Sequence, residues 1–212
     1  MGFTLVEIAI VLVIIGLLLG GVLKGQELIN SAKVKNLAND FRSVSTFVYA
    51  YQDKFRALPG DDRAADTHVG GTLAALATRG DARINGNWNS TTNTDESFLF
   101  WEHIRLANLA TGPTALNSPE YIPRNAEGGA IGITGTNPYT SGAGWTGNFF
   151  VCSTGIQGRF VRQIDTTIDD GNTTTGTVRV ICQGVCANDG GAAPANLTIA
   201  EDGNLYTICS SF

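Results

Sequence analysis

Few residues of this sequence have types and spacings that could do chemistry, and the densest group is an acidic segment in its C-terminal half. It holds Asp165, Asp169, Asp170 and Asn172, with Gly171 between the last two. Carboxylate and amide oxygens are the ligands that calcium prefers, and a glycine allows the sharp bend of a binding loop. The EF-hand spacing is absent, and a hairpin turn with solvated acids explains the same residues. We therefore predict no metal and keep these four residues as weak calcium candidates.

The four cysteines form the second group. Cys152, Cys182, Cys186 and Cys209 all lie in the last third of the chain, beyond an apolar N-terminal run. An even number of cysteines on the far side of a membrane segment indicates disulfides in an oxidising compartment. Four buried free thiols are the alternative. A zinc site is disfavoured, because Cys182-x₃-Cys186 lacks the tight spacing of a zinc knuckle.

The two histidines, His68 and His103, complete the candidates. Neither has the spacing of a metal-ligand pair, and His103 falls in a predicted amphipathic helix, where a packing or surface role is the common one. Phosphate-binding, dinucleotide-binding and nucleophile-elbow motifs are missing from the sequence. We predict that the chain is not an enzyme and uses no cofactor.

An apolar run at the N-terminus must position the rest of the chain. Residues 3–23 carry one charge, Glu7, and as a helix they would span roughly 30 Å, the thickness of the hydrocarbon core of a bilayer. A cleaved secretory signal is the alternative, but no basic residue precedes the run and no A-x-A-like site follows it. We predict a transmembrane helix that stays attached.

Glu7 is the unusual residue of this run. A charge within lipid is costly and usually has a partner, yet the first basic residue of the chain is Lys24. Two hypotheses follow. Either Glu7 reaches to the membrane interface, or it pairs with an amino terminus created by a cut before Phe3.

The N-terminal residues resemble the prepilin signature of type IV pilins and type II secretion pseudopilins. Its three features, Gly-Phe, a glutamate at the right offset and an apolar helix, coincide in Gly2-Phe3-Thr4-Leu5-Val6-Glu7 and the run that follows. The resemblance implies that a prepilin peptidase cuts between Gly2 and Phe3 and that Phe3 is then N-methylated. It also implies that Glu7 meets the N-terminus of a neighbouring subunit during assembly. Residues 1–2 would be the remainder of a leader, without the basic residues usual before the glycine.

The same resemblance implies a function, a location and partners. It implies a structural subunit of a type IV pilus-like filament, held in the bacterial inner membrane by one pass with its head in the periplasm, and later part of an extracellular pilus or a periplasmic pseudopilus. The implied partners are other subunits, the prepilin peptidase, the inner-membrane assembly platform and, before assembly, the lipid bilayer. A type II secretion pseudopilin and a singly anchored periplasmic binding module that does not polymerise remain alternatives. For the cysteines, the C-terminal loop disulfide of the family implies Cys186–Cys209, which leaves Cys152–Cys182 to link two strands.

Beyond the apolar run the helical pattern continues. Residues 24–57 are expected to be the amphipathic half of one long helix, ended by Ala57-Leu58-Pro59-Gly60-Asp61-Asp62. A second helix is predicted over residues 95–109, with Thr94 as its N-cap. The ALPGDD segment and this FWEH-containing helix resemble stretches of some larger pilin-like proteins. The apolar stripe of the long helix comprises Leu37, Phe41, Val44, Val48, Tyr51 and Phe55.

The remaining residues predict an antiparallel sheet, and hence an α+β head over residues 58–212 with the long N-terminal helix on one face, a pilin-like layout. Residues 110–147 are predicted to be a long surface loop. From Ala57 onward there are eight arginines, no lysine and fifteen acids, a net charge of −7, which disfavours nucleic acid as the main partner. The candidate strands are Asn148–Ser153, Gly158–Ile164, Thr177–Cys182 and Leu205–Ser210.

Overall fold

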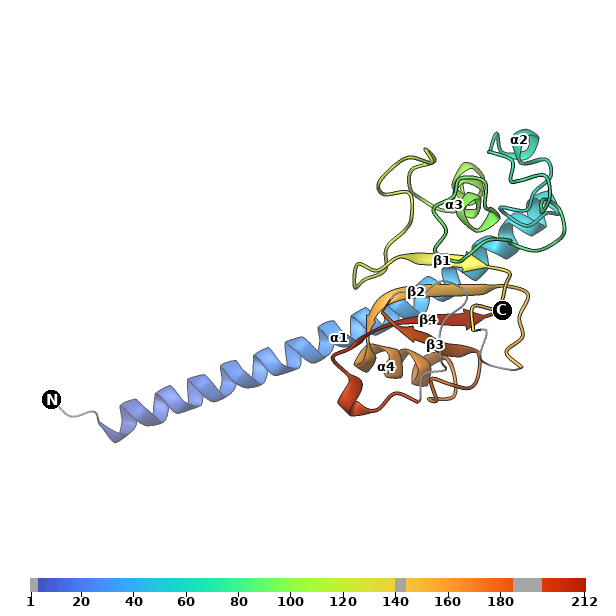
Figure 1. Cartoon of the computed structure of the whole chain (residues 1–212). Helices are drawn as coiled ribbons and strands as arrows, with labels where there is room; N and C mark the ends of the chain where they lie inside the picture. The colour runs from blue at the N-terminus through green and yellow to red at the C-terminus, as the bar shows by residue number, and fades with distance from the viewer. Residues whose placement is uncertain (1–3, 140–143, 185–195) are drawn as a thin grey trace.

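The computed structural model describes residues 4–139, 144–184 and 196–212, and its longest element is helix α1 (Leu5–Phe55). This one helix of 51 residues is about 76 Å long at a rise of 1.5 Å per residue. Its first half projects away from the head, and its second half lies along one side of it (Figure 1). The predicted single long helix is therefore confirmed. It ends at Phe55, and Arg56 follows in the left-handed conformation with φ of 57°.

The second half of α1 packs on the head through one face. The predicted stripe is confirmed, since five of its six side chains are buried and Phe55 is half-buried. The intervening side chains are mostly exposed, as expected of a helix that covers a core with one face only. The buried residues of α1 are Val34, Leu37, Ala38, Phe41, Val44, Ser45, Val48 and Tyr51.

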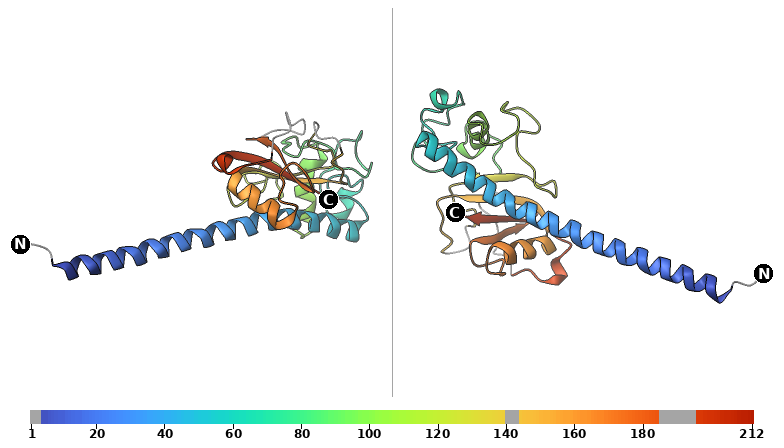
Figure 2. Two further views of the ribbon diagram at one scale, coloured as in Figure 1. Left: turned by 90° about the horizontal axis from the view of Figure 1, so that it is seen from below. Right: turned by 180° about the vertical axis from the view of Figure 1, so that it is seen from behind.

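The described residues of the head form one antiparallel sheet of four strands. They are β1 (Ile131–Thr134), β2 (Phe150–Gln157), β3 (Val178–Gln183) and β4 (Leu205–Ser211), in the order β1-β2-β4-β3. Helix α1 and helix α4 (Gly158–Ile168) cover one face of this sheet, as the views in Figure 2 show. The other face carries a second, smaller core of aromatic residues and cysteines. The predicted α+β class, with a long apolar N-terminal helix and an antiparallel sheet, is confirmed.

Successive residues of the strands divide between the two cores. Val151 and Ile208 face α1 and α4, whereas their neighbours Cys152 and Cys209 face the aromatic core. Trp145 and Phe150 belong to that second core, with ring centroids 4.9 Å apart. Both faces of the sheet are thus buried, which explains why its strands are apolar at consecutive positions.

Two predictions of secondary structure were wrong. The predicted strand Gly158–Ile164 is the first part of helix α4, because a helix places Phe160, Val161 and Ile164 together on the face toward α1 and the sheet. Strand β1 lies inside residues 110–147, predicted to be a loop. Its signal is short, and Gly132 interrupts it, because the Trp88 carbonyl lies where a Cβ would stand.

Three short elements complete the part of the head that the structure describes. Helix α3 (Glu96–Leu106) confirms the predicted second helix, but its N-cap is Asp95 rather than Thr94, and the Asp95 side chain makes no capping hydrogen bond. The others are α2 (Ala65–His68) and the 3₁₀ helix η1 (Ile199–Glu201). Helix α3 contacts both α1 and β1, so it fills the end of the head beside the ALPGDD turn.

Candidate functional site

The first turn of α1 holds Glu7 in a capping box with Thr4. The Glu7 Oε2 atom accepts hydrogen bonds from the Thr4 N–H at 2.8 Å and the Thr4 hydroxyl at 2.7 Å, and the Glu7 N–H donates to Thr4 Oγ1 at 3.3 Å. Such a box satisfies N–H groups that the start of a helix leaves free. The carboxylate therefore has partners on its own helix. The predicted processing residues Gly2 and Phe3 lie outside the described residues.

Around Glu7 the helix is apolar on every side. Residues 4–24 are all exposed, and α1 is long and apolar enough to cross a membrane. An exposed apolar surface of this extent indicates an apolar environment, either lipid or other helices. The large apolar side chains exposed over this half are Leu5, Val6, Ile8, Ile10, Val11, Leu12, Val13, Ile14, Ile15, Leu17, Leu18, Leu19, Val22 and Leu23.

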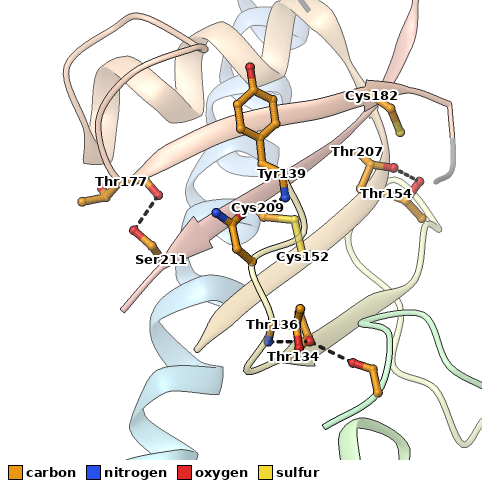
Figure 3. Close-up of a disulfide and its surroundings, with 12 residues drawn as sticks. Thr134, Thr136, Tyr139, Cys152, Thr154, Thr177, Cys182, Thr207, Cys209 and Ser211 are labelled. Carbon is orange, nitrogen blue, oxygen red and sulfur yellow. Dashed lines mark hydrogen bonds between the residues drawn. A yellow bond between two sulfur atoms is a disulfide. The ribbon is translucent and has the colours of Figure 1, made fainter. Parts of the chain in front are cut away.

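The disulfide pairing implied by the resemblance was wrong. Cys152 of β2 bonds to Cys209 of β4, and the two residues are direct partners in the antiparallel register (Figure 3). Cys182 lies on the neighbouring strand β3, opposite Thr207 rather than Cys152. Cys182 is also disulfide-bonded, and Cys186 lies outside the described residues. None of the described cysteines is a free thiol, which agrees with the prediction of disulfides.

The weak calcium candidates gather at the C-terminal end of α4. Carboxylate oxygens of Asp165, Asp169 and Asp170 lie within 4.8 Å of one another. Asp165 is fully buried, and burial, helped by the charges of the other two, raises its pKa to about 7. The Asn172 amide oxygen accepts from the Thr174 hydroxyl at 2.8 Å, so it braces the turn. The geometry brings three of the four candidates together, and the prediction of no metal stays untested.

The ALPGDD turn joins α1 to the rest of the head through buried hydrogen bonds. The Tyr51 hydroxyl donates to Asp62 Oδ2 at 2.8 Å, and His68 Nδ1 lies 2.7 Å from the same oxygen. The Gly60 N–H donates to His103 Nδ1 at 2.9 Å. His103 Nε2 therefore carries the proton and donates to the Thr72 carbonyl at 2.8 Å. His103 is fully buried, so its predicted packing role is confirmed.

A second acidic cluster beside this turn was missed at the level of sequence. Asp61, Asp81 and Glu96 bring carboxylate oxygens within 4.8 Å of one another. These residues are 35 positions apart at the extremes, and only the packing of α3 against the turn unites them. The two consecutive acids that follow Pro59-Gly60 were the available signal, because buried acids commonly fix a turn.

Comparison with protein-family models, with curated proteins and with solved structures gave no match in any of the three.

Proposed function

We propose that the chain is a structural subunit of a type IV pilus-like filament, cut by a prepilin peptidase and assembled through α1. One observation supports this most strongly. The first half of α1 is apolar and exposed all round, with a carboxylate, Glu7, in its first turn, while the second half buries one face in the head. A helix apolar on every side needs an apolar environment on every side, first lipid and then the helices of other subunits.

Glu7 would pair with a neighbouring subunit during assembly. A carboxylate in an apolar environment is costly unless it is paired with an opposite charge. The capping box gives Glu7 hydrogen bonds but no positive charge. The amine freed at Phe3 of a neighbouring subunit would supply that charge, so docking would be stabilised and the axial position of successive subunits would be set.

The head suits the outer wall of such a filament. It packs only on the second half of α1, so the first halves of many copies can bundle while the heads remain outside (Figure 1). Its disulfide between two strands fits an oxidising space beyond the membrane.

The test is the intact mass of the full chain, extracted from the membrane of a bacterium that has a prepilin peptidase. We expect the loss of Met1 and Gly2 and the gain of one methyl group, and no change in a matched strain without the peptidase. Glu7→Ala should then be processed normally but excluded from filaments. An unprocessed chain in the peptidase-containing strain would overturn the proposal and favour an anchored module that does not polymerise. Filaments that stay in the periplasm would favour a pseudopilin.

A further inference from the structure

Three carboxylates from three segments of the head converge beside the ALPGDD turn. Asp61 lies in the turn, Asp81 in the loop that follows α2, and Glu96 is the first residue of α3. One carboxylate oxygen from each residue lies within 4.8 Å of the other two. Oxygen ligands lie 2.3–2.6 Å from a calcium ion, so two ligands of one ion are at most about 5 Å apart. The three oxygens are therefore spaced to share a single ion.

Two of these carboxylates are withdrawn from water. Asp61 is 4% exposed and Glu96 is 0% exposed, whereas Asp81 is exposed and leaves one side of the cluster open to solvent. None of the ion pairs formed by the described residues includes any of the three. Buried like charges raise one another's free energy unless a proton or a cation compensates them.

Glu96 has a second unusual feature, a buried oxygen, which does not depend on the charge of the cluster. Its Oε2 atom accepts hydrogen bonds from the Asn85 backbone N–H at 2.8 Å and the Asn85 side-chain amide at 3.2 Å. Its Oε1 atom is buried and accepts no hydrogen bond of good geometry from the described residues, because the nearby Thr78 hydroxyl donates instead to the Ala75 carbonyl at 3.4 Å. Buried oxygens without a partner are rare and destabilising. A bound cation would satisfy this oxygen and compensate the summed charge together, whereas a proton on Glu96 would neutralise only that residue.

The backbone holds the three carboxylates in place. The Asp61 carboxylate accepts the N–H groups of Gly80, Asp81 and Ala82, which fixes the loop that carries the second acid. Gly60 lies so close to the Glu96 carbonyl that a Cβ would clash with it, which fixes the third acid relative to the turn. Side chains held by packing and hydrogen bonds before the ligand arrives are typical of built sites.

We propose that Asp61, Asp81 and Glu96 bind one divalent cation of the oxygen-preferring class, with calcium as the best match. The donors are carboxylates without histidine or cysteine, which disfavours zinc and copper and suits calcium or magnesium. Calcium accepts irregular geometry and completes its shell with water, which the open side at Asp81 admits. The ion would link the turn after α1 to α3 and so stabilise the packing of the head on the long helix.

The test uses the full chain in detergent micelles, stripped of metal with a chelator and titrated with calcium by calorimetry, with thermal unfolding measured in parallel. Every sample carries Asp165→Asn, so that the acidic cluster of α4 does not contribute. We expect one calcium per chain and a higher melting temperature on calcium addition. Adding Asp81→Asn should weaken binding by roughly tenfold or more, and because Asp81 is exposed this change should leave folding intact. Asp66→Asn, at an exposed position of nearby α2, is the matched control and should bind as before.

Glu96→Gln distinguishes a metal site from a carboxylate that is buried without binding an ion. At a metal site this variant loses the calcium-dependent rise in melting temperature, while its metal-free form is no less stable than the parent because a buried charge has been removed. The absence of calcium binding in the Asp165→Asn chain would overturn the proposal. Binding that neither Asp81→Asn nor Glu96→Gln weakens would overturn it too.

Discussion

Thr4 and Glu7 are joined by hydrogen bonds at the first turn of α1, where the Glu7 carboxylate accepts hydrogen bonds from both the N–H and the hydroxyl of Thr4. The acid therefore has two possible tasks. It stabilises the start of its own helix, and under the proposed function it also receives the amine of a neighbouring subunit. The two tasks can be separated, because only the first one needs the Thr4 hydroxyl.

Thr4→Ala should leave filament assembly largely intact, whereas Glu7→Ala should abolish it. Loss of the hydroxyl removes a helix cap worth about 1 kcal/mol, but the carboxylate remains to pair with a neighbour. The measurement is the amount of sheared filament relative to processed subunit in the membrane. Equal loss of filaments in both variants would mean that the cap, and not the charge, is what assembly requires.

The Cys152–Cys209 bond should be the link found when the unreduced protein is digested and its peptides are sequenced by mass spectrometry. Replacing both cysteines with serine should lower the free energy of unfolding by roughly 4 kcal/mol, the loop-entropy value for a sequence separation of 57 residues. Denaturant titration of the full chain in detergent measures this change. A Cys152–Cys182 peptide would contradict the strand order β2-β4-β3, in which β4 separates the two residues.

Elements with a local sequence pattern could be predicted. Elements whose conformation depends on contacts with distant segments could not. Helix α1 follows from a continuous apolar run and a stripe at helical spacing, and β3 and β4 follow from short runs between turns that contain β-branched and, in β4, aromatic residues. Helix α4 was assigned to a strand, because its apolar residues suit either period and only the cover of α1 over the sheet selects the helix.

The site residues show the same division. Glu7 is recognisable from its position in an apolar run, without any knowledge of the fold. The disulfide pairing depends on which strands are neighbours, and β4 inserts between β2 and β3 although it follows both in the chain. The cluster of Asp61, Asp81 and Glu96 depends on a turn, a loop and a helix start meeting in space. No local sequence pattern predicts that these three residues lie close together.

His103 should make the head less stable in acid. Burial lowers the pKa of this imidazole, so below about pH 6.5 the unfolded chain takes up a proton that the native chain excludes. Stability is therefore lost progressively as the pH falls through that value. His103→Gln should be less stable at pH 8, but its stability should fall less steeply between pH 6.5 and 5.

The variant and the parent must be compared by how steeply their unfolding free energy changes with pH, because buried acids stabilise the fold as the pH falls. Burial raises the pKa of Asp40 to about 6, so its contribution to stability grows as the pH falls from 7 to 4. The measurement is the free energy of unfolding of both chains across this range. Identical slopes in the variant and the parent would show that His103 is not held neutral by the fold.

The stripe of α1 should account for much of the attachment of the head. Leu37→Ala should cost about 2–5 kcal/mol, because Leu37 is 1% exposed and its loss leaves a cavity in the main core. Leu76→Ala is the matched control, since Leu76 is 82% exposed, and it should change the free energy of unfolding by less than about 0.5 kcal/mol. Similar losses in both variants, measured by denaturant titration, would mean that α1 does not pack on the head in this way.

Gly60→Ala should be more damaging than a substitution in a Pro-Gly turn usually is, because Gly60 is buried. Gly60 has φ of +92°, and a Cβ there would collide with the Glu96 carbonyl, which belongs to the backbone and cannot rotate away. The left-handed conformation alone costs about 1 kcal/mol or more for a residue with a side chain, and the collision forces the turn away from α3. Gly203→Ala is the control, because no atom of the described residues lies within 4 Å of its Cβ position. Gly60→Ala should also weaken calcium binding at the proposed site, since it separates Asp61 from Glu96, and Gly203→Ala should not. A Gly60→Ala chain as stable as the control would show that the turn is not pressed against α3.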